Sequence, residues 1–268
     1  MRRHRSSIST LALRALFIVA ALAGFAPLAE AQLVIYDDFT APLLDGVRWS
    51  GRQLNTNEGG NGSSLEIERS VANGRLVMRA RVAGGPEPDT GQRSSETALM
   101  FRHPGALNEI VFNATVKELQ IAGCASGSAS AGGVRGVYAF FNDGLGDVVA
   151  TIELRRSSDA DTAATMLEVV GTLTHRTDAG DETLLGWVPL GTAAIGQKVR
   201  LRVKWDRDDS TVKFQKDLDA VAPIAYSNPV VADAGAPRKY LGAIATSGDC
   251  RAASSTVVGL FNTVRVNQ

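Results

Sequence analysis

One glutamate of this chain lies where a side chain could bind a ligand or act on it. Glu153 is central to the segment Asp147–Arg155, whose alternating pattern predicts a β-strand. Thr151 and Arg155 lie two residues to either side, so they share a strand face with Glu153. A single carboxylate beside an arginine is more typical of an ion pair or a binding group than of half a hydrolytic pair. We therefore predict that Thr151, Glu153 and Arg155 bind a ligand.

Other polar groups of the sequence fit structural roles better. Glu66 and Glu68 place two carboxylates on one face of a predicted strand, which is typical of a solvated sheet face. His103 precedes a proline in a predicted turn, and His175 ends a predicted strand. The sequence contains no G-x-S-x-G turn that would expose a nucleophilic serine. No residue is therefore predicted to be catalytic.

The three tryptophans could stack on sugar rings, because an aromatic plate suits the apolar face of a sugar. Trp49 and Trp205 belong to apolar alternations, so we expect them in the core. Trp187 follows Gly186 and shortly precedes Pro189, which favours an exposed position. Trp187 joins Glu153 and its neighbours as a predicted ligand-binding residue.

The two cysteines, Cys124 and Cys250, lie in segments rich in small residues. An even number of cysteines in an oxidising compartment favours a disulfide, and this one would close a loop of well over a hundred residues. Closing such a loop contributes about 3–5 kcal/mol in the chain-entropy model. A metal site would need two more ligands, and neither His103 nor His175 has ligand-like spacing to a cysteine. We predict the disulfide.

The elements that position these groups are short strands separated by turn residues such as Asn73-Gly74. The clearest alternation, in Val199–Trp205, puts Val, Leu and Trp on one face and Arg and Lys on the other. We predict an all-β chain folded as a two-sheet antiparallel β-sandwich. The expected strands are Leu33–Asp38, Leu65–Val71, Arg75–Val82, Ser95–Phe101, Glu109–Leu119, Gly136–Phe141, Asp147–Arg155, Thr165–His175, Thr183–Val188, Lys198–Trp205, Thr211–Lys216, Tyr240–Thr246 and Val257–Val266.

Residues 1–31 have the order of a secretory signal peptide: arginines, then an apolar run, then Ala29-Glu30-Ala31. We therefore expect a secreted or periplasmic protein whose single domain comprises residues 32–268. Removing residues 1–31 takes away four arginines and one glutamate, which leaves a formal net charge of −3. Such a balance argues against nucleic acid as a partner. No stretch after the signal peptide approaches the roughly 18 apolar residues of a transmembrane segment.

Several phrases resemble the concanavalin A-like lectin/glucanase superfamily, which includes laminarinase-like enzymes and laminin G-like jelly rolls. Asp37-Asp38-Phe39 followed by Leu44–Trp49 resembles the superfamily's "DDF…LD…W" entry. Asn73–Met78 resembles its "nGkLvl" hairpin, Asn108–Leu119 its "yGryEaRvK" strand, and Phe261–Gln268 its closing "vDyVRVyq" strand. The resemblance spans nearly all of the chain after residue 31 and implies a jelly-roll sandwich that handles glycans.

The catalytic signatures of the superfamily are incomplete here. The strand that would carry E-x-D-x-x-E offers Glu153 without its partners, whereas retaining hydrolysis needs two carboxyls about 5 Å apart. Arg93-Ser94-Ser95-Glu96 resembles the "RSE" strand of alginate lyases. Their "QIH" phrase is missing because Ala122 follows Gln120-Ile121, and their "YFKAG" phrase is missing because Ala139 follows Tyr138. Lyase chemistry is therefore not predicted.

The resemblance also implies a structural calcium ion near the first and last strands. Its ligands here would be Asp37, Asp38 and Asn262, where an amide replaces the carboxylate of the closing phrase. No other cofactor is predicted. The leading hypothesis is a secreted, non-catalytic module that binds a carbohydrate or an extracellular protein. A divergent polysaccharide-cleaving hydrolase or lyase and a structural or adhesive envelope protein are the alternatives.

Overall fold

The computed structural model describes residues 32–51, 53–60, 63–83, 93–122, 135–142, 148–156, 165–176, 182–227, 237–247 and 254–267. The predicted signal peptide and both cysteines of the predicted disulfide, Cys124 and Cys250, lie outside these residues. The strands, all within one compact unit from Leu33 onward, are β1 Leu33–Asp37, β2 Trp49–Ser50, β3 Leu54–Gly60, β4 Ser63–Ala72, β5 Arg75–Ala83, β6 Arg93–Phe101, β7 Glu109–Ala122, β8 Arg135–Asn142, β9 Val148–Arg156, β10 Met166–Arg176, β11 Glu182–Ala194, β12 Val199–Asp206, β13 Thr211–Lys216, β14 Ala222–Ala225, β15 Arg238–Ser247 and β16 Ser254–Asn267. No helix among the described residues has the length and apolar character needed to cross a membrane.

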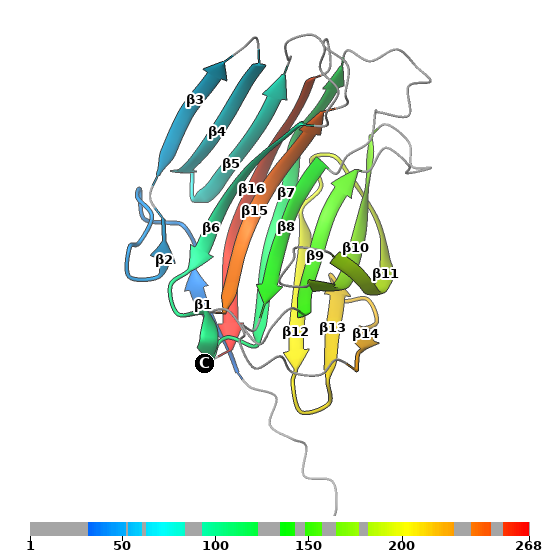
Figure 1. Ribbon diagram of the computed structural model, residues 1–268. Helices are drawn as coiled ribbons and strands as arrows, with labels where there is room; N and C mark the ends of the chain where they lie inside the picture. The colour runs from blue at the N-terminus through cyan, green and yellow to red at the C-terminus, as the bar shows by residue number, and fades with distance from the viewer. Residues whose placement is uncertain are drawn as a thin grey trace, which may run out of the picture. The chain divides into compact units, whose positions relative to one another are not determined.

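The strands form two antiparallel sheets that pack face to face (Figure 1). One is nine-stranded, in the order β14-β13-β12-β7-β16-β5-β4-β3, with β1 paired to β16. The other is seven-stranded, in the order β11-β10-β9-β8-β15-β6-β2. This arrangement confirms the predicted all-β, two-sheet antiparallel sandwich.

The core lies between the sheets and follows from alternation along the strands. In β12 every second side chain is buried, and these are the apolar ones predicted from Val199–Trp205. Trp49 and Trp205 are 0% and 1% exposed, as predicted, and Trp187 is 49% exposed, also as predicted. Each Å² of apolar surface that is buried stabilises the fold by about 25 cal/mol, so the inward-facing residues hold the two sheets together.

Three strands were not expected from the sequence, and each has a physical reason. β2 has only two residues, and β14 contains Pro223, which cannot donate a ladder hydrogen bond. β3 reads Leu-Asn-Thr-Asn-Glu-Gly-Gly, a composition typical of a loop, and is a strand because it pairs along its whole length with β4. β11 runs well beyond the expected Thr183–Val188 despite Pro189, which an edge strand tolerates.

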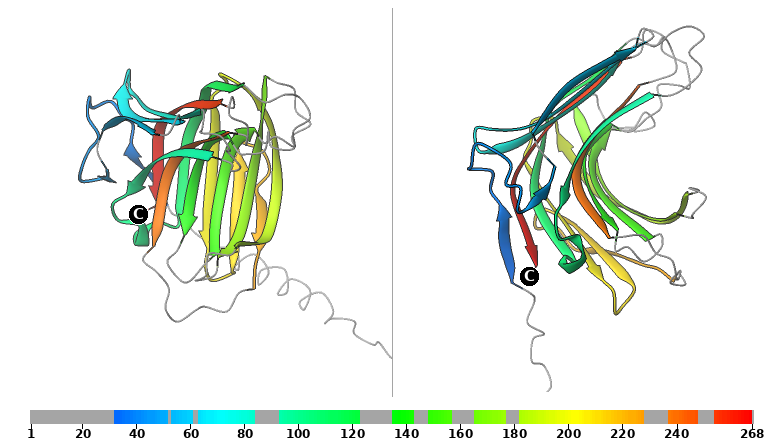
Figure 2. Two further views of the ribbon diagram at one scale, coloured as in Figure 1. Left: turned by 45° about the horizontal axis from the view of Figure 1, so that its top comes forward. Right: turned by 60° about the vertical axis from the view of Figure 1, so that its left-hand side comes forward.

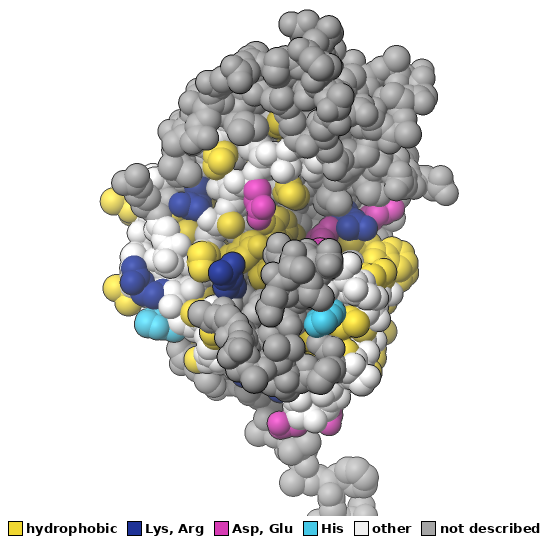
Figure 3. Space-filling view, in the orientation of Figure 1, with side chains coloured by type: hydrophobic (Ala, Val, Ile, Leu, Met, Phe, Trp, Pro, Cys, Tyr) yellow, Lys and Arg dark blue, Asp and Glu magenta, His cyan; other side chains and the backbone are white. Residues whose placement is uncertain are grey.

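The outer face of the seven-stranded sheet carries the side chains of β9 that were predicted to bind a ligand. The sheet curves, so this face is hollowed (Figure 2). Apolar side chains gather in the middle of this face, with acidic and basic side chains beside them (Figure 3). The groups predicted from β9 therefore project from a curved sheet away from the core.

Candidate functional site

A cavity of about 370 Å³ lies on the hollowed face of the seven-stranded sheet. Its size is within the range of small-molecule sites, which is about 300–1,000 Å³. Six neighbouring strands contribute the lining, which consists of Glu96 from β6, Gly136, Val137, Tyr138 and Phe140 from β8, Val149, Thr151, Glu153 and Arg155 from β9, Thr172 and Thr174 from β10, Glu182 and Leu184 from β11, and Ile244 from β15.

Arg155 lies between two carboxylates at this cavity. Its Nη1 is 2.9 Å from Oε2 of Glu153, and its Nε is 3.8 Å from Oε2 of Glu168, directly opposite on β10. Burial raises the pKa of Glu153, and the charge and hydrogen bond of Arg155 oppose that rise. The ion pair that the sequence pattern indicated is therefore present. Ligand binding by these residues stays a prediction.

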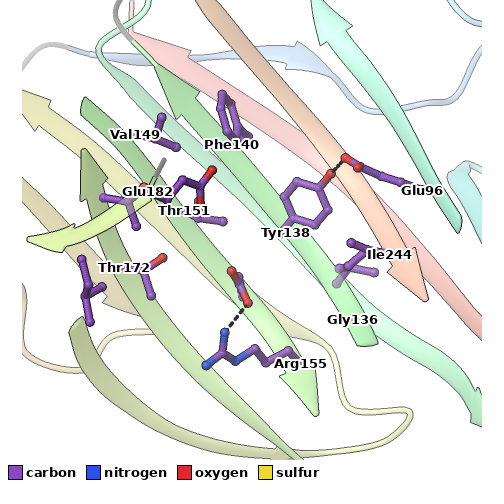
Figure 4. A pocket seen from close by; sticks show the side chains of 14 residues that line it. Glu96, Gly136, Tyr138, Phe140, Val149, Thr151, Arg155, Thr172, Glu182 and Ile244 are labelled. Carbon is purple, nitrogen blue, oxygen red and sulfur yellow. Dashed lines mark hydrogen bonds and ion pairs between the residues drawn. The ribbon is translucent and has the colours of Figure 1, made fainter. Parts of the chain in front are cut away.

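Tyr138 reaches across a neighbouring strand to Glu96. It faces Gly242 on β15, and its hydroxyl donates a hydrogen bond to Oε1 of Glu96 on β6, the strand beyond (Figure 4). A Cβ at Gly242 would be 2.4 Å from Cζ of Tyr138, so the ring lies directly over this glycine. A larger residue at position 242 would force the ring away, and Gly242 is therefore what allows the contact.

The environment of Tyr138 keeps its hydroxyl protonated. Burial raises the pKa of Tyr138 strongly, and the negative charge of Glu96 raises it further. A general base works best when its pKa is near the working pH. Tyr138 thus serves as a hydrogen-bond donor at neutral pH and is poorly suited to accept a proton from a substrate.

Aromatic rings continue along the face beside the cavity. Phe140 stacks on Tyr240 with ring centroids 4.4 Å apart and an interplanar angle of 12°. Tyr138 meets the same Tyr240 edge-on at 5.8 Å and 78°. Rings fixed by one another in this way provide a rigid apolar surface next to the charged groups.

The glutamate that is hydrogen-bonded to Tyr138 and the glutamate opposite it in the register are not neighbours in the sheet. Glu153 on β9 is directly opposite Tyr138, whereas Glu96 on β6 is two strands beyond β8. With strands about 4.8 Å apart, the backbones of β6 and β9 are about 14 Å apart. This layout provides hydrogen-bonding groups around a ring, and it lacks the adjacent placement of two carboxylates on one strand.

Three of the four residues that were predicted to bind a ligand line the cavity. Thr151, Glu153 and Arg155 line the same cavity. Trp187 is opposite Thr172 in the β10–β11 register but is outside the cavity lining. The pair formed by Glu96 and Tyr138 was not predicted, because in the sequence each residue belongs only to an incomplete lyase phrase.

The residues predicted to bind calcium lie elsewhere. Asp37 and Asp38 line a second hollow of about 470 Å³ near β1, and Asn262 is outside that lining. Asp37 Oδ1 accepts a hydrogen bond from the Phe39 amide at 2.8 Å, and Oδ2 accepts one from Trp49 Nε1 at 2.6 Å.

These contacts favour a structural role for Asp37, because both of its oxygens already face N–H donors. Among the described residues, no group of three or more His, Cys, Asp or Glu side chains forms a candidate metal site. Calcium binding by Asp37, Asp38 and Asn262 stays a prediction. A melting temperature that responds to millimolar calcium and to a chelator would support it, and an unchanged melting temperature would contradict it.

Comparison with known proteins finds no matching family model and no significant match among curated proteins. Among solved structures, the chain is similar to a laminarinase from Flavobacterium sp. UMI-01, with 12% identity, 88% of this chain and 100% of that chain covered, and a TM-score of 0.42.

It is also similar to a glycoside hydrolase family 16 endo-glucanase from Bacteroides ovatus, with 11% identity, 86% and 98% covered, and a TM-score of 0.47. The exoplasmic/lumenal domain of VIP36 is 14% identical, with 75% and 84% covered and a TM-score of 0.33. TM-scores below 0.5 assign neither a family nor an activity to this chain.

Proposed function

We propose that this chain is a secreted or periplasmic glycan-binding protein of the concanavalin A-like superfamily, and that the cavity on the seven-stranded sheet is its sugar site. One observation carries the proposal: aromatic rings, hydroxyls and a charged pair converge on a single cavity. Tyr138 and Phe140 line it beside Thr151, Glu153 and Arg155.

This combination suits the chemistry of a sugar. A pyranose ring has an apolar face of C–H groups that packs against aromatic rings, and its rim of hydroxyls needs donors and acceptors in fixed positions. The Glu153–Arg155 ion pair offers both kinds of partner, and its 2.9 Å contact holds the two side chains in place. Thr151 adds a hydroxyl on the same strand face.

A glycan array on protein lacking residues 1–31 tests the proposal. We expect binding to a defined subset of glycans and weaker binding by Phe140→Ala and Thr151→Val. The matched control is Phe214→Leu, which changes an aromatic residue of the core with 0% exposure and leaves the cavity lining intact. An array without any bound glycan would contradict the proposal and favour the structural or adhesive alternative.

A divergent polysaccharide-cleaving enzyme is the second candidate. It is favoured by Glu153, a carboxyl in the cavity whose pKa is raised by burial, as a general acid requires. The test is incubation with β-glucans, galactans and alginate, followed by product analysis. We expect no turnover, because Glu153 has no second carboxylate on its strand face. Steady release of oligosaccharides that is lost in Glu153→Gln would overturn the non-catalytic interpretation.

A further inference from the structure

We infer that this cavity selects sugars bearing amines and disfavours sugars bearing acidic groups. The inference rests on the proposed glycan-binding function and adds the charge of the ligand to it. It follows from how Arg155, the arginine in the described part of the cavity lining, is paired with the surrounding carboxylates.

Arg155 is the only basic residue among the described residues that line the cavity. Its guanidinium lies 2.9 Å from the carboxylate of Glu153 and 3.8 Å from that of Glu168. A uronic acid or a sulfate would have to compete with these two carboxylates for one cation. The positive charge that would normally recognise an anionic sugar is therefore already balanced by carboxylates of the protein itself.

Glu153 and Glu168 both lie beside the Arg155 guanidinium, whereas Glu96 contacts a neutral hydroxyl. Its Oε1 accepts a hydrogen bond from the hydroxyl of Tyr138, which is a neutral group. With Glu153 ionised, the group of Arg155, Glu153 and Glu168 has a formal net charge of −1, and with Glu153 protonated Arg155 and Glu168 balance each other. Glu96 adds one negative charge in either case, and Glu182, opposite Arg176, also lines the cavity. Low-dielectric walls around a cleft strengthen such a field, so it attracts cations and repels anions.

A protonated sugar amine fits this environment chemically. An ammonium group donates three hydrogen bonds, and Glu96 is an acceptor at the rim of the cavity. Because Glu96 contacts the hydroxyl of Tyr138, an ammonium bound at Glu96 lies next to the phenolic oxygen, which is a further acceptor. A deacetylated chitin oligosaccharide combines these amines with apolar pyranose faces.

The test compares three oligosaccharides of equal length by calorimetry at low salt and mildly acidic pH: glucosamine oligomers, neutral β-glucan oligomers and alginate oligomers. We expect the glucosamine oligomer to bind about fivefold more tightly than the neutral one, the size of one solvent-accessible ion pair. The alginate oligomer should bind most weakly. Raising the salt concentration should shrink these differences.

Glu96→Gln removes the charge and keeps an acceptor for Tyr138, so it should abolish most of the preference for the amine. Asp208→Asn is the matched control, because it removes one carboxylate from the exposed turn before β13 on the other sheet. Equal or tighter binding of alginate overturns the inference and leaves glycan binding intact. An unchanged preference in Glu96→Gln also overturns it. Failure of all three oligomers to bind overturns the proposed function as well.

Discussion

Glutamates on the two sheets of this protein have different cross-strand neighbours. On the nine-stranded sheet, Glu66 is directly opposite Arg81 and Glu68 is directly opposite Arg79. The carboxylate–guanidinium distances are 3.1 and 3.7 Å. Opposite charges in directly facing positions stabilise a sheet, so the role of these residues is to stabilise the nine-stranded sheet.

On the seven-stranded sheet, the two glutamates that contact or lie opposite Tyr138 face neutral groups, whereas Glu168 and Glu182 lie opposite Arg155 and Arg176. Glu153 is opposite Tyr138, and Glu96 is opposite Ile244. Both glutamates line the cavity. Carboxylates that face a ring or an alkyl group gain less from their cross-strand partner, so their presence favours a role toward a ligand. For Glu66, Glu68, Glu96 and Glu153, the residue opposite in the sheet thus separates a structural ion pair from a candidate binding group. Glu182 combines both features, because it lines the cavity and lies opposite Arg176.

The largest effect on stability is expected for a substitution of Glu109, which is the buried glutamate among the described ion pairs of the nine-stranded sheet. Its side chain is 1% exposed and contacts Arg202 at 2.6 Å and Lys204 at 3.7 Å. Glu109→Gln leaves both cations without their counter-charge, which should lower the free energy of unfolding by about 3 kcal/mol. Urea denaturation measures this. A loss as small as that of an exposed pair would show that burial does not matter for this class.

Gly242→Ala is expected to have the next largest effect, and it acts on the cavity. The new Cβ would be 2.4 Å from Cζ of Tyr138, so the ring must move off β15. We expect a loss of about 1–3 kcal/mol from overpacking and a clear loss of glycan binding. The matched control is Gly46→Ala, where a Cβ meets no atom within 4 Å. Unchanged binding in Gly242→Ala would remove Tyr138 from the site.

The fold was predictable because alternation along a strand is a local property. The alternation in Val199–Trp205 predicts which side chains are buried, and the burial along β12 follows that pattern. The trio of Thr151, Glu153 and Arg155 was predictable for the same reason, since residues two apart on one strand share a face. Local spacing alone places these three side chains together.

The contact between Glu96 and Tyr138 was not predictable from spacing. The two residues are 42 positions apart, and β15, from much later in the chain, lies between their strands. Strand order of this kind depends on how the whole chain packs, which no local period encodes. Gly242 was the available signal, because a glycine within a strand often marks a close approach by a neighbouring group.

We expect the pH dependence of stability to differ between the wild type and Glu153→Gln. Burial raises the pKa of Glu153 in the folded protein, and Arg155 only opposes that rise. A carboxyl with a raised folded pKa stabilises the fold below its unfolded pKa, and this contribution is lost as the pH rises through the folded pKa. The stability of the wild type relative to Glu153→Gln should therefore fall between the ordinary glutamate range and the raised pKa. Denaturation series across mildly acidic pH measure it, and a constant difference would contradict it.

The smallest effect is expected for Glu68→Gln on the nine-stranded sheet. The side chains of Arg79 and Glu68 are 42% and 27% exposed, so water and salt screen their attraction. Exposed pairs of this kind contribute about 0–1 kcal/mol, and we expect a loss within that range that shrinks at high salt. Glycan binding should not change, because Glu68 is outside the cavity lining. If Glu68→Gln weakened glycan binding as much as Glu153→Gln, the neighbour opposite a glutamate would no longer distinguish the two classes, and the site would have to extend beyond the seven-stranded sheet.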